Sequence, residues 1–94
     1  MNKDKVFVKK LDDTYALKLQ VTIKEANGKT THVITKSENL LDFLPKNHSD
    51  EEIASSIFRF LLDREPKEVI LYNFDISIIP SYFPEFFTEI FSYL

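Results

Sequence analysis

Residues 69–79, with the sequence VILYNFDISII, begin with the longest unbroken apolar run in the chain. After that run Phe74, Ile76 and Ile78 alternate with polar residues. β-Branched and aromatic residues with this period are typical of a strand. The stretch therefore predicts a central strand that is covered on both faces at its start and on one face further along.

An antiparallel hairpin sheet is predicted before this strand. Val6, Phe7 and Val8 lie between lysines, as in an edge strand that is protected from pairing with other chains. From Thr14 to Lys24 apolar and polar residues alternate, which indicates a long strand with one face on the core and one in water. The apolar positions of that strand are Tyr15, Leu17, Leu19, Val21 and Ile23.

Asn27-Gly28 contains the only glycine and is a strong hairpin signal, because both residues tolerate positive φ. It leads to a third strand, over residues 30–35. A type I′ turn would place Ile34 beside Val21, whereas a type I turn with a glycine bulge would place Val33 there. The sequence leaves both registers open.

Three helices are expected. A short one contains Leu40 to Leu44 and ends at Pro45. A second spans Ser49–Asp63, where Ser49 and Glu52 have the spacing of a capping box. The third starts near Pro84 and carries a stripe of aromatic and aliphatic residues to the C-terminus.

These elements predict an α+β fold for the single domain 1–94, in the order β-β-β-α-α-β-α, with two or three helices packed on one face of a small antiparallel sheet. The strand of residues 69–74 either joins the hairpin sheet or pairs with its copy in a dimer. The apolar stripe of the Ser49–Asp63 helix is wider than one sheet face needs. The helix is therefore either wedged between the sheet and another helix, or exposes Phe58 and Leu62.

The chain offers few chemical groups for catalysis. It has no cysteine, which excludes disulfides and thiolate chemistry, and its lone glycine cannot form a phosphate-binding loop. His48 with Asp50 and Glu51 is the nearest approach to a metal site, but a solvated loop beside a capped helix explains these residues equally well. We therefore expect no enzymatic activity, no metal and no cofactor.

Charge is unevenly distributed along the chain. Residues 1–46 contain nine basic and six acidic residues, and residues 47–94 contain three and nine. The isoelectric point near 5.3, together with the placement of Tyr15 on the face opposite Lys18 and Lys24, argues against nucleic-acid binding. The sequence also has neither a secretory signal nor an apolar run of the roughly 20 residues that cross a membrane, so we expect a cytoplasmic protein.

Elimination favours a small interaction module that occupies the surface of another protein, as an inhibitor, an immunity protein or a phage or host antagonist does. The expected contact residues are Phe58, Leu62, Tyr82 and Tyr93, since aromatic anchors dominate interface energies. A structural homodimer or assembly subunit is the alternative. An acidic mimic of nucleic acid, using the carboxylates of the C-terminal half, is a lesser one.

Overall fold

The computed structural model describes residues 5–12, 17–36 and 47–94 and confirms the α+β class. The predicted helix at residues 40–44 and the predicted core position Tyr15 lie outside these ranges. The described elements are, in chain order, β1 (Val6–Asp12), β2 (Leu17–Glu25), β3 (Gly28–Lys36), α1 (Asp50–Leu62), β4 (Asn73–Asp75), the 3-10 turn η2 (Ile76–Ile78), α2 (Ile79–Tyr82), α3 (Phe86–Glu89) and the 3-10 turn η3 (Ile90–Tyr93).

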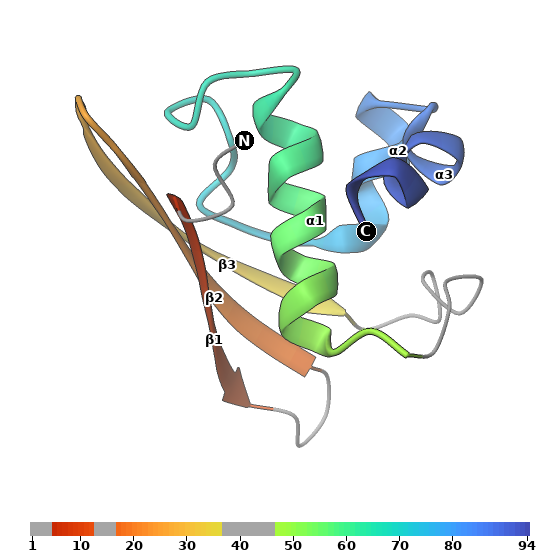
Figure 1. Ribbon diagram of the computed structural model, residues 1–94, viewed down its shortest axis with the longest axis horizontal. Coiled ribbons are helices and arrows are strands. Elements are labelled where there is room, and N and C mark those ends of the chain that lie inside the picture. The colour runs from red at the N-terminus through yellow and green to blue at the C-terminus, as the bar shows by residue number, and fades with distance from the viewer. Residues whose placement is uncertain (1–4, 13–16, 37–46) are drawn as a thin grey trace.

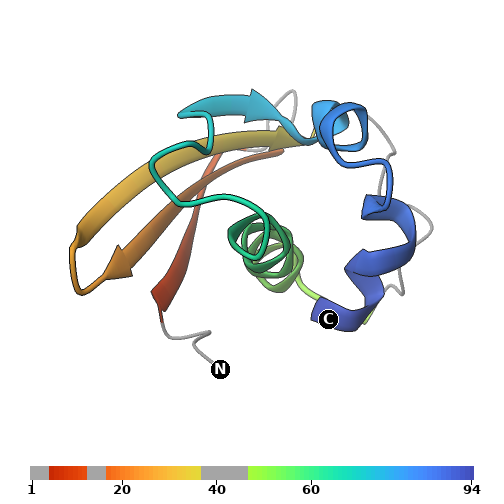
Figure 2. The ribbon, with the colours of Figure 1, turned by 90° about the horizontal axis from the view of Figure 1, so that it is seen from above.

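The strands form one mixed sheet in the order β1-β2-β3-β4. β1, β2 and β3 pair antiparallel, whereas β4 runs parallel to β3. The sheet curves around α1, and the C-terminal helices lie on the far side of α1 (Figures 1 and 2). The strand that follows α1 therefore joins the hairpin sheet within the same chain.

The β2-β3 hairpin turns one residue earlier than predicted. Val21 pairs with His32, so both expected registers are wrong. Glu25 pairs with Gly28, whose φ of 131° favours glycine, and no described non-glycine residue has a positive φ. A type I′ turn is thereby excluded, and the observed register places His32 on the core face next to Ile34.

α1 is wedged between two layers, as one of the two alternatives for its wide apolar stripe predicted. Ser49 accepts a hydrogen bond from the Glu52 amide, and the Glu52 side chain accepts one from the Ser49 amide, which confirms the predicted capping box. Ile57 and Phe58 are buried towards the core, and Phe60 meets Phe86 edge to face at 5.3 Å. Burial on both sides accounts for the width of the stripe.

The long central strand predicted over residues 69–79 is wrong in its extent. Only Asn73–Asp75 pairs with β3, and Val69 and Leu71 are exposed rather than covered on both faces. The strand ends at Asp75 because its carboxylate accepts a hydrogen bond from the Ser77 amide and so caps η2. Pro80 lies in the first turn of α2, where a missing amide proton costs little.

The predicted C-terminal helix is broken into shorter pieces. α3 ends at Glu89 and the chain continues as η3, so the apolar stripe does not keep one direction. Phe86 and Ile90 are fully buried, whereas Phe87 and Phe91, expected on the same stripe, are exposed.

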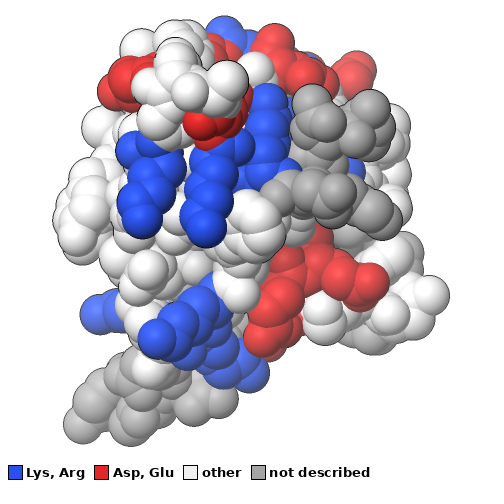
Figure 3. All heavy atoms as spheres, turned by 60° about the vertical axis from the view of Figure 1, so that its left-hand side comes forward, with Lys and Arg blue, Asp and Glu red and all other residues white. Residues whose placement is uncertain are grey.

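The outer face of the sheet is left open, because α1 and the C-terminal helices all lie on the inner face (Figure 2). The strands β1, β2 and β3 contain six lysines and two acidic residues, while residues 47–94 contain three basic and nine acidic residues. Lysine side chains gather over the side of the molecule that carries the sheet (Figure 3). The fold thus separates the charges into a basic sheet and an acidic helical layer.

Candidate functional site

An apolar groove opens between the end of α1, the loop that follows it, and the η2-α2 turn. Its volume is about 230 Å³. Apart from the carboxyl of Glu65 and the hydroxyl of Tyr82, its side chains are hydrocarbon. The lining residues are Leu61, Glu65, Val69, Ile70, Leu71, Phe74, Ile78, Ile79, Tyr82 and Phe83.

Large apolar side chains stand exposed at the groove and beside it. Val69 is 58% exposed, Leu71 51% and Tyr82 68%, and Tyr72, next to Leu71 in the chain, is 67% exposed. Single exposed apolar residues are common, whereas a cluster of four at and beside a groove is a feature typical of interaction sites. We call this set the apolar rim.

Two hydrogen bonds hold the backbone of Leu71 and Tyr72, the part of the rim that lies beside β3. The carbonyl of Leu71 accepts a bond of 2.8 Å from His32 Nδ1, and that of Tyr72 accepts one of 2.7 Å from the Val33 amide. Both carbonyls are thus drawn towards β3, and the adjacent side chains are left on the outside.

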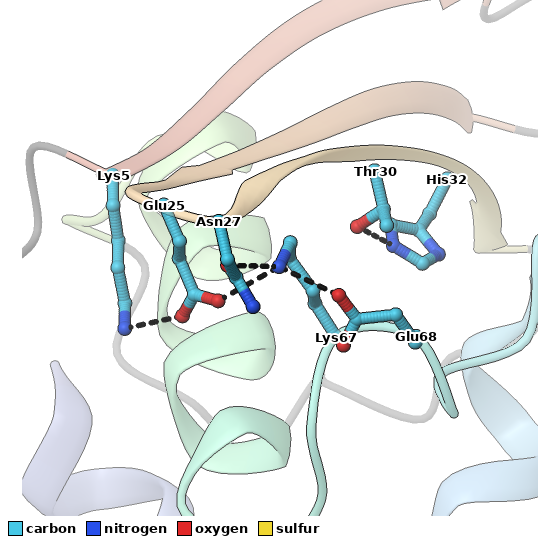
Figure 4. A network of polar contacts seen from close by, with 7 residues as sticks. All are labelled: Lys5, Glu25, Asn27, Thr30, His32, Lys67 and Glu68. Carbon is cyan, nitrogen blue, oxygen red and sulfur yellow. Dashed lines mark hydrogen bonds and ion pairs between the residues drawn. The ribbon is translucent and has the colours of Figure 1, made fainter.

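His32 is a buried structural side chain that holds this loop. Because a carbonyl oxygen only accepts, Nδ1 carries the proton, and in the neutral ring Nε2 accepts from the Thr30 hydroxyl at 2.8 Å (Figure 4). The ring lies 5.4 Å from that of Phe58. With both nitrogens bonded and 2% of its surface exposed, His32 is not available as a catalytic base or metal ligand.

The other side of the same loop is fixed to the hairpin by Lys67, whose side chain is 1% exposed. Its ammonium donates to Glu25 at 3.0 Å, Asn27 at 2.8 Å and Glu68 at 2.7 Å, and Lys5 binds the second oxygen of Glu25 at 2.9 Å (Figure 4). All three N–H donors of Lys67 are used. Hydrogen bonding to Glu68 raises the pKa of Lys67 despite its burial, so the amine stays charged and is no nucleophile.

The carboxyl groups in the groove and in the chain segments next to it differ in their surroundings. Burial raises the pKa of Glu65, the carboxylic acid in its lining. Asp63 accepts from the Tyr93 hydroxyl at 2.5 Å, and Glu85 accepts from Arg64 at 2.8 Å. The hydrogen bond from Arg64 lowers the pKa of Glu85, which therefore stays ionised at neutral pH.

Of the four predicted contact residues, only Tyr82 lies at the groove. Phe58 is 0% exposed and packs against His32 and Phe74, so the expectation of an exposed Phe58 is wrong: β3 and β4 cover that side of α1. Leu62 is partly buried against the core. Tyr93 is partly buried, and its hydroxyl bonds Asp63 and Arg64.

Val69, Leu71 and Tyr72 were not predicted as surface residues. Their apolar run has the composition of a buried strand. The signal that could have revealed them is non-local, since it depends on His32 and Val33 capturing the loop carbonyls.

A second hollow of about 330 Å³, between β1 and α1, has polar residues in its lining, including His48, Glu52, Ser56 and Arg59. These groups serve the helix: Glu52 completes the capping box, and the Ser56 hydroxyl bonds the backbone carbonyls of Glu52 and Tyr93. His48 lies 3.7 Å from Glu52. Within the described ranges, no three His, Asp or Glu residues are grouped so as to hold a metal ion.

The described helices include none with the length and apolar character that crossing a membrane requires. Comparison with protein families, curated proteins and solved structures finds no match to this chain.

Proposed function

We propose that this protein is a small interaction module that acts by occupying the surface of a partner protein, in the cytoplasm. The observation that carries the proposal is the apolar rim around the groove, whose exposed surface no other described part of the chain covers. An inhibitor, an immunity protein or an antagonist acts in this way, because its effect comes from binding and requires no chemistry of its own.

The size of the groove favours a protein side chain over a small molecule. Sites for drug-sized ligands measure about 300–1,000 Å³, whereas this groove measures about 230 Å³. The groove is also open to solvent at the apolar rim. One aromatic or aliphatic anchor from a partner, with neighbouring residues covering Leu71 and Tyr82, fits this shape.

The charged residues also indicate which charge a partner of the groove would carry. Residues 47–94 contain nine acidic and three basic residues, and Glu65 lies in the groove itself. A carboxyl group in the groove and a net acidic C-terminal half favour a basic partner over an acidic one. We therefore propose that the occupant is a protein segment with an apolar anchor flanked by lysine or arginine.

Selection from a random peptide library displayed on phage tests this proposal. The library is panned on the immobilised protein, and the affinity of each enriched peptide is then measured for the protein and for its variants. We expect the enriched peptides to combine one apolar anchor with nearby basic residues. Loss of an interface anchor costs more than about 1.4 kcal/mol, so Leu71→Glu and Tyr82→Ala should each weaken binding at least about tenfold.

Phe91→Ser is the matched control, because Phe91 is also exposed but does not line the groove. It should change the affinity by less than about twofold. Peptides that are acidic, or that bind the Leu71→Glu variant equally well, would contradict the proposal. Measuring the mass of the protein across a range of concentrations tests the alternative, a homodimer in which the rim covers itself; a dimer that Leu71→Glu dissociates would establish it instead.

A further inference from the structure

The open outer face of the sheet is a second surface, chemically unlike the groove. Alternation along the strands places Phe7 and Lys9 of β1 on this face, with Lys18 and Lys24 of β2 and Lys29 of β3. The uncharged polar residues between the lysines are Gln20, Thr22, Thr31 and Thr35. No described helix packs on this face (Figure 2).

Two acidic side chains that the structure describes in the sheet, Glu25 and Asp75, lie away from the middle of this face. Glu25 belongs to the inner face, where Lys5 and Lys67 bind it. Asp75 lies in β4 at the sheet edge, where it accepts from Thr35 at 2.6 Å and from the Ser77 amide at 3.0 Å. The view from the side of the sheet shows lysines spread across the surface with acidic residues towards its margins (Figure 3).

An aromatic ring lies among these lysines. Phe7 is 48% exposed, and its neighbours across the sheet are Thr22 and Thr31. The Lys24 ammonium is 5.1 Å from the centre of the Phe7 ring. An exposed aromatic beside lysines is the combination with which sheet surfaces stack a base and bind its phosphates.

We propose that this face binds single-stranded nucleic acid. Lysines are spread over this face, with Asp75 at its β4 edge; lysines are depleted in protein interfaces but bind phosphate well. Lys18 and Lys24 stand six residues apart on β2, which corresponds to about 20 Å of strand and so to a path of several nucleotides. The sheet has four strands and is too wide to enter a duplex groove, which admits a helix or a two-stranded ribbon, whereas a single strand of nucleic acid can lie across it.

The low isoelectric point, which argued against nucleic-acid binding, describes the whole chain, but the acidic residues are concentrated in the helical layer. The aromatic residue on the open face is Phe7, from β1, rather than an aromatic of the second strand. The open face is also independent of the groove, since the two surfaces share no residue named for either of them.

Fluorescence anisotropy with a labelled oligothymidine of about 12 nucleotides tests the proposal. With four phosphate contacts, affinity should fall about 50-fold between about 50 and 200 mM salt. Lys9→Gln with Lys24→Gln removes two contacts, so affinity should fall only about sevenfold over the same range. Phe7→Leu should weaken binding at least about fivefold with the same salt dependence, because it removes stacking and no charge.

The matched control is Lys10→Gln with Lys36→Gln, which removes the same charge from the inner face of β1 and β3. It should leave affinity and salt dependence close to those of the parent protein. Equal weakening by both double variants, or no binding of the oligothymidine at about 50 mM salt, would overturn the proposal. Equally tight binding of an oligoglutamate, unaffected by Phe7→Leu, would show that the face takes an acidic protein instead. Circular dichroism confirms that each variant is folded.

Discussion

The loop between α1 and β4 has one side whose polar groups are satisfied within the chain and one side whose apolar groups are exposed to solvent. On the hairpin side, the buried ammonium of Lys67 finds three acceptors, and every donor is used. On the groove side, Val69 and Leu71 present hydrocarbon to solvent. Two carboxyl groups of the loop differ in the same way: Lys67 lowers the pKa of Glu68, while burial raises that of Glu65. The first side is complete within the chain, and the second is where a partner would be needed.

The largest loss of stability should come from Lys67→Met, which removes the ammonium that holds the hairpin side of the loop. The substitution leaves Glu25, Asn27 and Glu68 without their shared donor, and the loop loses its link to the hairpin. The Lys67 side chain is buried while Glu25 and Glu68 are partly exposed, so the cost comes from losing the central cation of a charged network. Removing one partner of such a network is strongly destabilising. We expect this variant to show a greater fall in the free energy of unfolding, measured by urea denaturation, than any other substitution in the loop or its contacts.

Lys5→Met is the control for that change, because Lys5 binds the same Glu25 from a partly exposed position. Its loss should lower the free energy of unfolding by less than about 1 kcal/mol. Equal effects of the two substitutions would mean that the buried ammonium contributes nothing beyond an ordinary surface ion pair.

An intermediate effect is expected for His32→Leu, which removes the side-chain hydrogen bond between β3 and the Leu71 carbonyl of the loop. The change leaves the Leu71 carbonyl without its side-chain donor, and this should cost about 1–3 kcal/mol of unfolding free energy. Thr30→Val removes only the hydroxyl bond and should cost about 0.5–1.5 kcal/mol. If His32 positions the rim, His32→Leu also weakens peptide binding at the groove, whereas Thr30→Val leaves it largely unchanged.

The smallest effect concerns Glu65. Because burial raises its pKa above 4.5, its ionisation opposes folding at neutral pH, and the opposition disappears as the pH falls through the folded-state pKa. Glu65→Gln should therefore stabilise the protein at pH 7 by less than about 1 kcal/mol and have no effect near pH 4.

Glu68→Gln should have the opposite effect and lower the free energy of unfolding at pH 7. Its lowered pKa adds stability above the unfolded-state value of 4.5, and this stability is lost as the pH falls towards the folded-state pKa. Urea denaturation of both variants at several pH values checks the pair. Parallel pH profiles for the two variants would show that the two sides of the loop do not differ electrostatically.

Local signals in the sequence predicted local structure well. Ser49 and Glu52 are close in the chain and form the expected capping box, and the alternation in β2 buries Leu19, Val21 and Ile23 as expected. The local signal at Asn27-Gly28 predicted a hairpin but not its register. Other predictions failed because distant residues decide the outcome. Whether residues 69–72 are covered depends on hydrogen bonds from His32 and Val33, which composition cannot reveal. The groove was therefore missed, except for Tyr82.

The late position of β4 in the chain has a kinetic consequence. β1, β2 and β3 are joined through neighbouring segments, whereas Thr35 and Asp75 meet across 40 residues. Contacts across such a distance close later in folding than local hairpins, and they open at lower free energy. We expect amide protons of β4 to exchange with solvent sooner than those of β2. Since Phe74 of β4 lines the groove, the groove would be lost in such an opening while the hairpin sheet persisted.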